Sequence, residues 1–163
     1  MKLLLTAALL AASAAPAAAH YCAPSPDFEG RTLVLWVTDK TNPDEAPCLA
    51  RLAYNKCEAD TNPDGQNPKG SLRFFGGNNL AALLAVADDG AVTVSLHFAG
   101  ALGIASGVSN LGTFPYQRAL YRGIGVDKAT AYDLNARSSK VIGNVFLLPA
   151  ENLTERALKL CPL

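Results

Sequence analysis

The sequence has almost no net charge. Lysine and arginine together number 14, aspartate and glutamate together also number 14, and charged residues make up only 17% of the 163 residues. No block of lysine and arginine stands out from this balance, whereas nucleic-acid-binding domains carry such residues clustered on one face. We therefore expect no nucleic-acid partner.

The sequence also lacks a hydrophobic run of the length that a membrane span requires, which is about 20 residues. Residues 3–15 are apolar except for Thr6 and Ser13, and Pro16 ends the run. Later apolar stretches are short or are interrupted by glycine and polar residues. We therefore expect no membrane span.

The first residues instead have the layout of a secretory signal peptide. Lys2 supplies a positive charge ahead of the apolar run, and Ala17-Ala18-Ala19 provides the small-residue pattern that signal peptidase accepts. Cleavage there makes His20 the first residue of the mature chain. The sequence predicts a signal peptide at residues 1–19 and a single secreted domain at residues 20–163, extracellular or, in a Gram-negative bacterium, periplasmic.

The chain has no C-x2-C pair of the kind common in zinc sites. An even number of cysteines in an exported chain indicates disulfides, here two. A helix over residues 46–58 would place Cys48 and Cys57 roughly 13 Å apart on opposite faces, which is beyond the reach of a disulfide. Each of them would then pair with Cys22 or Cys161. If those two pair with each other instead, the segment must turn back on itself. The four are Cys22, Cys48, Cys57 and Cys161.

The clearest predicted strand covers residues 31–38. Its centre is a continuous run of β-branched, aliphatic and aromatic side chains, which indicates burial on both faces. Residues 91–98 alternate between apolar and polar side chains, and this pattern places His97 on the more polar face of a strand. Further strands are predicted at residues 71–75, 129–135 and 141–148.

Helix is predicted in three places. Residues 46–58 have a proline in the first turn and an apolar side, and Pro149 opens a C-terminal helix. For residues 78–87 the composition favours a helix, although the Asp89-Gly90 pair that follows is a hairpin signal; we favour the helix. The expected fold class is α+β: one compact domain with a mostly antiparallel sheet, a helix near residues 46–58 and a C-terminal helix, tied by two disulfides.

The only two histidines suggest a metal site. As the N-terminal residue, His20 could chelate one ion through its amine and Nδ1, and His97 could add a third nitrogen; such ligands suit copper. In these two features the chain resembles exported copper proteins and copper oxygenases that use a histidine brace. The resemblance implies that copper would be the cofactor. Otherwise His97 is an ordinary strand residue.

A second candidate metal site lies in the polar loop after residue 59. Its sequence matches the opening of a calcium-binding loop, in which alternate oxygen ligands converge on the ion. The twelfth position is Ser71 rather than glutamate, and two prolines interrupt the loop, so a polar surface turn is the favoured interpretation. The candidate calcium ligands are Asp60, Asn62, Asp64 and Gln66.

Catalytic signatures are missing from the sequence. It contains no P-loop, no H-E-x-x-H, no G-x-G-x-x-G and no G-x-S-x-G, and no catalytic residue can be assigned. We expect a small secreted disulfide-containing protein, a non-catalytic module that binds a small molecule or a protein partner. The alternative is a copper-binding protein or an oxidative enzyme that uses His20 and His97.

Overall fold

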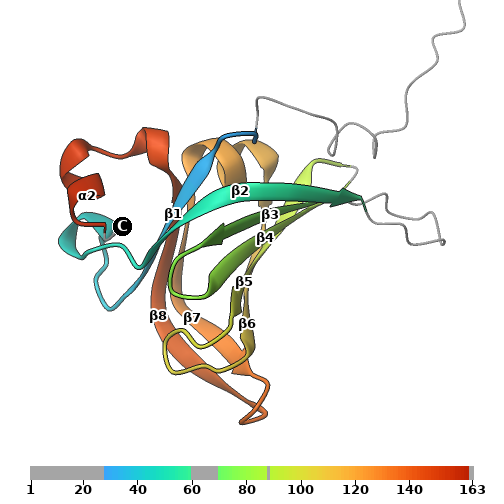
Figure 1. Cartoon of the computed structure of the whole chain (residues 1–163), viewed down its shortest axis with the longest axis vertical. Helices are drawn as coiled ribbons and strands as arrows, with labels where there is room; N and C mark the ends of the chain where they lie inside the picture. Colours follow the sequence, from blue (N-terminus) through green and yellow to red (C-terminus); the bar gives the residue numbers. More distant parts are fainter. Residues whose placement is uncertain (1–27, 60–69, 88, 162–163) are drawn as a thin grey trace, which may run out of the picture.

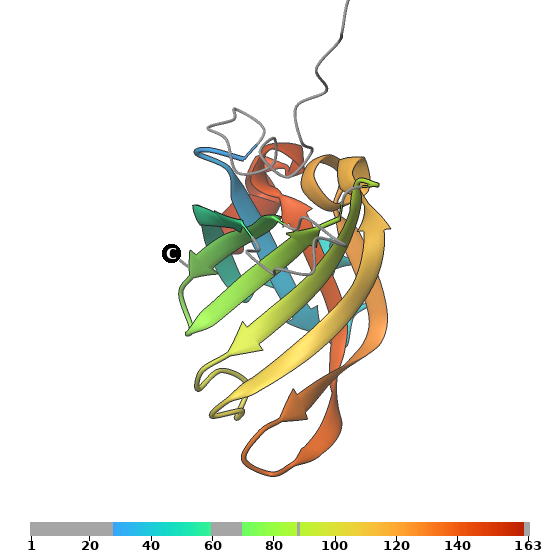
Figure 2. The ribbon, with the colours of Figure 1, turned by 90° about the vertical axis from the view of Figure 1, so that its right-hand side faces the viewer.

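The chain forms a closed barrel of eight antiparallel strands (Figures 1 and 2). The computed structural model describes residues 28–59, 70–87 and 89–161. Each strand pairs with the next one along the chain, and the last pairs with the first, which closes the barrel. The strands are β1 (Thr32–Thr38), β2 (Ala50–Ala59), β3 (Gly70–Gly76), β4 (Leu80–Val86), β5 (Ala91–Phe98), β6 (Gly107–Pro115), β7 (Ile124–Asp133) and β8 (Ser138–Pro149).

Helical structure in the described part of the chain is limited to short turns. A 3-10 turn, η1 (Pro43–Glu45), lies between β1 and β2, and a π-helical turn, η2 (Arg118–Arg122), lies between β6 and β7. After β8 come the 3-10 turn η3 (Ala150–Asn152) and the short helix α2 (Glu155–Lys159). The expected α+β class is therefore wrong: the fold is mostly β, and the C-terminal helix is a single short segment.

The helix expected near residues 46–58 is also wrong, because this segment contains strand β2. Leu52 and Tyr54 alternate as strand residues do, each packing toward the barrel interior. The pairing of β2 with β3 then shifts between Tyr54 and Lys56, and this β-bulge brings Cys57 to the inner side. The apolar residues whose spacing imitated a helix, Leu49, Leu52 and Ala53, precede this bulge; Leu52 is buried, whereas Ala53 is exposed on the outer face.

Residues 78–87 likewise form a strand, β4, where we favoured a helix. Leu80, Ala82, Leu84 and Val86 face the interior, but the residues between them are alanine and leucine as well. With no polar side chain on either face, β4 has no alternation to reveal it. The strands predicted at residues 31–38 and 91–98 are confirmed as β1 and β5.

Apolar side chains from all eight strands fill the barrel interior. The largest that are fully buried include Leu33, Phe74, Leu84, Leu96 and Leu147, each at most 1% exposed. An eight-stranded barrel is just wide enough for its own side chains to fill. The buried side chains of the described residues are apolar except for Ser109, so most polar side chains of the barrel lie on its outer face.

The barrel is weakest between β6 and β7. The register between these strands covers only Gly107 with Asp133 and Val108 with Tyr132. Beyond that point the buried Ser109 Oγ donates a hydrogen bond to the Thr130 carbonyl at 2.6 Å, which takes the place of a backbone bond. Ala119 and Leu120 of η2 add to the core where the two strands separate.

Replacing Ser109 should therefore weaken the contact between β6 and β7. We expect Ser109→Ala to lower the free energy of unfolding by about 1–2 kcal/mol, because the hydrogen bond of the buried Ser109 hydroxyl to the Thr130 carbonyl is lost. Urea unfolding followed by circular dichroism measures the change. The exposed Ser138→Ala serves as the control and should stay within about 0.5 kcal/mol of wild type. Equal stability of the two variants would contradict a structural role for the Ser109 hydroxyl.

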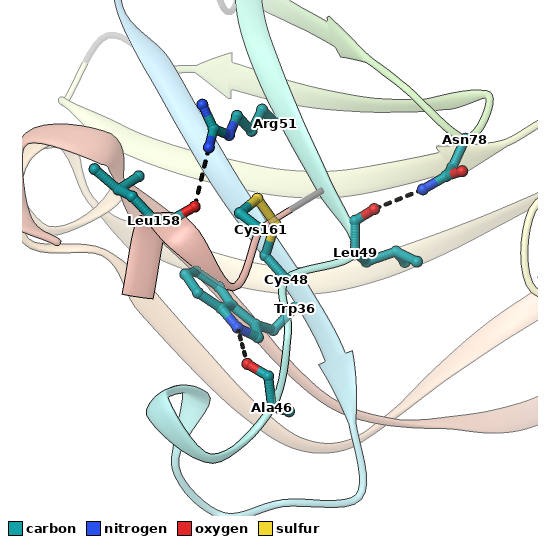
Figure 3. Close-up of a disulfide and its surroundings, with 8 residues drawn as sticks. All are labelled: Trp36, Ala46, Cys48, Leu49, Arg51, Asn78, Leu158 and Cys161. Atoms are coloured by element: carbon teal, nitrogen blue, oxygen red, sulfur yellow. Dashed lines mark hydrogen bonds between the residues drawn. A yellow bond between two sulfur atoms is a disulfide. The ribbon is translucent and has the colours of Figure 1, made fainter. Parts of the chain in front are cut away.

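A second apolar cluster lies on the outside of β1 and β8. Val34 and Trp36 of β1 face outward, and the C-terminal segment covers them with Leu153, Leu158 and Cys161. The Trp36 indole donates a hydrogen bond to the Ala46 carbonyl at 3.1 Å (Figure 3). This cluster explains why both faces of β1 are buried, as its sequence predicted.

The disulfide Cys48–Cys161 ties the C-terminal segment to the chain just before β2 (Figure 3). Where two disulfides were expected, the described part of the chain contains one with both partners in it, and Cys57 is disulfide-bonded as well. Cys22 lies outside the described residues. Cys48 pairs with a cysteine near a chain end, as one of the two alternatives predicted. That alternative assumed a helix over residues 46–58, whereas the chain there enters strand β2.

Candidate functional site

His97 lies on the outer face of β5, as the alternation of that strand predicted. Its Nε2 is 3.2 Å from the hydroxyl of Ser95, two residues earlier on the same face, and the two share a hydrogen bond. Across the sheet His97 is in register with Ala81 of β4 on one side and Val108 of β6 on the other. The imidazole therefore sits on an open sheet surface.

Beside His97 the outer face of β3 and β4 is hollowed into a pocket of about 150 Å³. Strand β4 contributes Ala81 and Leu83 to its lining, and β3 contributes Arg73 and Phe75. Across these two strands Phe75 is in register with the small side chain of Ala81, and Arg73 with Leu83. The pocket thus combines an apolar surface, an aromatic ring, a guanidinium and an imidazole.

The surroundings of His97 keep its ring uncharged. Burial lowers the pKa of His97 below its ordinary value of 6.5, and the positive charge of Arg73 lowers this pKa further. At neutral pH the ring therefore carries one donor and one acceptor nitrogen. Acidification has to force a proton onto His97 against the charge of Arg73, which disfavours a second positive charge at this position.

A serine and a histidine in contact raise the question of nucleophilic catalysis. In that chemistry the histidine takes the serine proton and becomes an imidazolium, which a carboxylate stabilises. Here the charged neighbour of His97 is Arg73, which destabilises the imidazolium. Ser95 and His97 are thus better arranged to hydrogen-bond a ligand than to activate a nucleophile.

Most of the site residues proposed from the sequence lie outside the described residues. These are His20 of the copper site and all four calcium candidates, Asp60, Asn62, Asp64 and Gln66; the signal peptide also falls there. Within the described ranges no three histidine, cysteine, aspartate or glutamate side chains gather in a way that could hold a metal. The copper site of His20 and His97 and the calcium site stay predictions.

Sequence reasoning missed Arg73, Phe75 and Leu83. A signal was present in β4, whose segment LAALLAV has no polar residue on either face. In a closed barrel one face of every strand points outward, so an all-apolar strand places an apolar strip on the outside of the barrel; the C-terminal segment covers this strip on β1, whereas on β4 it is only partly buried. Recognising β4 as a strand would have revealed this strip.

Comparisons with known proteins add no further assignment. No family model, no curated protein and no solved structure matches the chain. None of the helices in the described residues is long and apolar enough to cross a membrane. The fold and the geometry of the site therefore have to carry the functional argument.

Proposed function

We propose that this protein is a non-catalytic binding module that acts outside the cytoplasm and holds a ring-sized apolar group bearing a carboxylate. The observation that carries the proposal is the pocket beside His97, in which Arg73 stands next to the apolar surface of Ala81 and Leu83. The disulfide Cys48–Cys161 supports an exported protein, because such bonds persist in oxidising compartments.

The size of the pocket limits its occupant. A volume of about 150 Å³ is also the size of an engineered apolar cavity that holds benzene. One ring or one branched aliphatic group therefore fits against Leu83, with the Phe75 ring, itself 41% exposed, alongside it. Such a group is either a small free acid or the end of a peptide.

The polar residues of the pocket determine which end group is recognised. The Arg73 guanidinium suits a carboxylate, since its planar donors match two oxygens. One of the two hydrogens of the neutral His97 ring and the Ser95 hydroxyl is used in the hydrogen bond between them, so together they can donate one further hydrogen bond. A neutral alcohol of the same shape would lose the charge-assisted contact.

The test uses benzoate and benzyl alcohol as probes of equal ring size on the exported protein. In 1H–15N spectra, benzoate should shift the amide signals of the outer faces of β3, β4 and β5, and it should bind about tenfold more tightly than benzyl alcohol. Arg73→Gln should abolish that preference. A short peptide that ends in phenylalanine, with and without an amidated C-terminus, separates a peptide ligand from a free acid.

The control for this experiment is Arg122→Gln, which removes an exposed arginine at η2 and should leave the preference intact. Two results would count against the proposal. One is equal affinity for benzoate and benzyl alcohol in the wild-type protein. The other is a set of shifted signals that lies away from β3, β4 and β5.

A further inference from the structure

Exposed large hydrophobic side chains gather at one end of the barrel, away from the C-terminal segment. Only six such side chains occur among the described residues, and four belong to this end, which we call the tip patch. Its members are Leu102 (39% exposed), Tyr132 (44%), Leu134 (52%) and Val141 (63%).

Two connections hold the tip patch together. The Leu134 backbone N–H donates to the Ser106 carbonyl at 2.9 Å, and Lys140 Nζ donates to the Leu102 carbonyl at 3.4 Å. These bonds join the loop after β5 to the hairpin between β7 and β8. That hairpin projects beyond the other strands at the lower end of the molecule (Figures 1 and 2). The loop and the hairpin that carry the tip patch are thus joined by hydrogen bonds at this end of the barrel.

The backbone at Leu102 indicates that its exposure has a function. Leu102 has a φ of +52° and Gly103 a φ of +70°, between the bridged residues Ala101 and Ile104. A two-residue turn with two positive φ values favours asparagine, aspartate or glycine. A leucine here is strained and gains little from packing, so local stability does not explain its presence.

The charges of this end indicate what covers the patch. Arg137 lies in the turn of the β7–β8 hairpin and Lys140 at the start of β8, whereas the Asp133 carboxylate accepts hydrogen bonds from the Asn135 and Ala136 backbone N–H groups. The tip therefore carries two basic side chains and one carboxylate, a net charge of +1, around apolar ones. A two-fold pairing of two copies would bring these like charges together, whereas an anionic lipid surface complements them.

We infer that the tip patch binds the surface of an anionic phospholipid bilayer. Leu102, Leu134 and Val141 enter the boundary between headgroups and acyl chains, and Tyr132 keeps its hydroxyl at headgroup level. Arg137 and Lys140 contact lipid phosphates. The inference uses residues separate from the His97 pocket and holds whether or not that pocket binds a carboxylate.

The test is co-sedimentation of the exported protein with vesicles. Phosphatidylcholine vesicles with about one-third phosphatidylserine should pellet the protein at low salt, and phosphatidylcholine alone should not. Leu102→Asn should weaken binding at least tenfold and still fold, because asparagine suits the turn. Leu134→Ser should do the same. Leu160→Ser removes an exposed leucine elsewhere and should bind as the wild type does.

Several outcomes would overturn the inference. Wild-type protein that stays in the supernatant, or that pellets equally with both vesicles, excludes an anionic bilayer as the occupant. The inference is also overturned if Leu102→Asn binds the anionic vesicles as tightly as the wild type does. A dimer in sedimentation velocity that Leu134→Ser dissociates would assign the patch to a second copy, and retention on a purified protein partner that Leu102→Asn abolishes would assign it to a protein.

Discussion

Gly76→Ala is expected to lower the free energy of unfolding by about 3 kcal/mol or more. Gly76 ends β3 and is in register with Leu52 of β2. A Cβ added there would overlap the Arg51 carbonyl oxygen and would lie 2.6 Å from Leu52 Cδ2. Because the first of these atoms is backbone within a paired strand, a side-chain rotation cannot relieve the overlap. The two strands would have to move apart, at a point where the sheet carries buried core residues.

The adjacent glycine provides the matched control. An added Cβ at Gly77 meets no atom within 4 Å, so Gly77→Ala should be neutral or slightly stabilising. Urea unfolding of both variants measures the difference, and hydrogen exchange of the β2 and β3 amides should be faster in Gly76→Ala. If both variants have the same stability, then β2 and β3 do not approach as closely as the structure shows.

The sequence predicted some strands and missed others for a physical reason. Strand β5 was found because Thr93, Ser95 and His97 mark its outer face with polar side chains. Strand β4 has no such marker, and in β2 the alternation is obscured by an apolar residue on the outer face, Ala53, and by Leu49 just ahead of the strand. Both errors replaced strands with helices, and together they changed the expected fold class.

Closure of the barrel could not be predicted from local patterns. It depends on the pairing of β1 with β8, which sets Trp36 opposite Phe146. Nothing in the spacing of either segment specifies the other as its partner, because alternation indicates which face is buried and not which strand lies alongside. The long-range contacts therefore had to come from the structure.

Of the candidate site, the sequence singled out only His97. The sequence placed His97 on the more polar face of its strand, and the structure confirms that its side chain is exposed. The pocket around it depends on Arg73 and Leu83, which reach His97 only because β3, β4 and β5 pair in order. Because a helix was predicted at residues 78–87, the strand between β3 and β5 was missing from the prediction, and the pocket could not be predicted.

Removing the disulfide is expected to produce the other large effect. Cys48 and Cys161 are 113 residues apart, and a bond that closes a loop of this length stabilises a protein by about 4 kcal/mol. We expect Cys48→Ala/Cys161→Ala to lose about that much stability in urea. Using both substitutions avoids leaving a single reactive thiol.

Trp36 reports where this loss occurs. It is the only tryptophan of the chain and is 1% exposed, beneath the segment that Cys161 holds in place. Without the disulfide the remaining contacts of that segment include the hydrogen bond from Arg51 Nη2 to the Leu158 carbonyl at 3.0 Å (Figure 3). The double variant should therefore show red-shifted Trp36 fluorescence at urea concentrations below those that unfold the barrel.

Arg51→Gln is the comparison for that experiment, because it removes a noncovalent contact to the same segment. It should lower stability by only about 1 kcal/mol and leave the Trp36 emission of the folded protein unchanged. If the double variant also keeps its native emission until the barrel unfolds, the segment is held by the packing of Leu153 and Leu158 rather than by the disulfide. In that case the double variant would unfold in a single transition, at a lower urea concentration than the wild type.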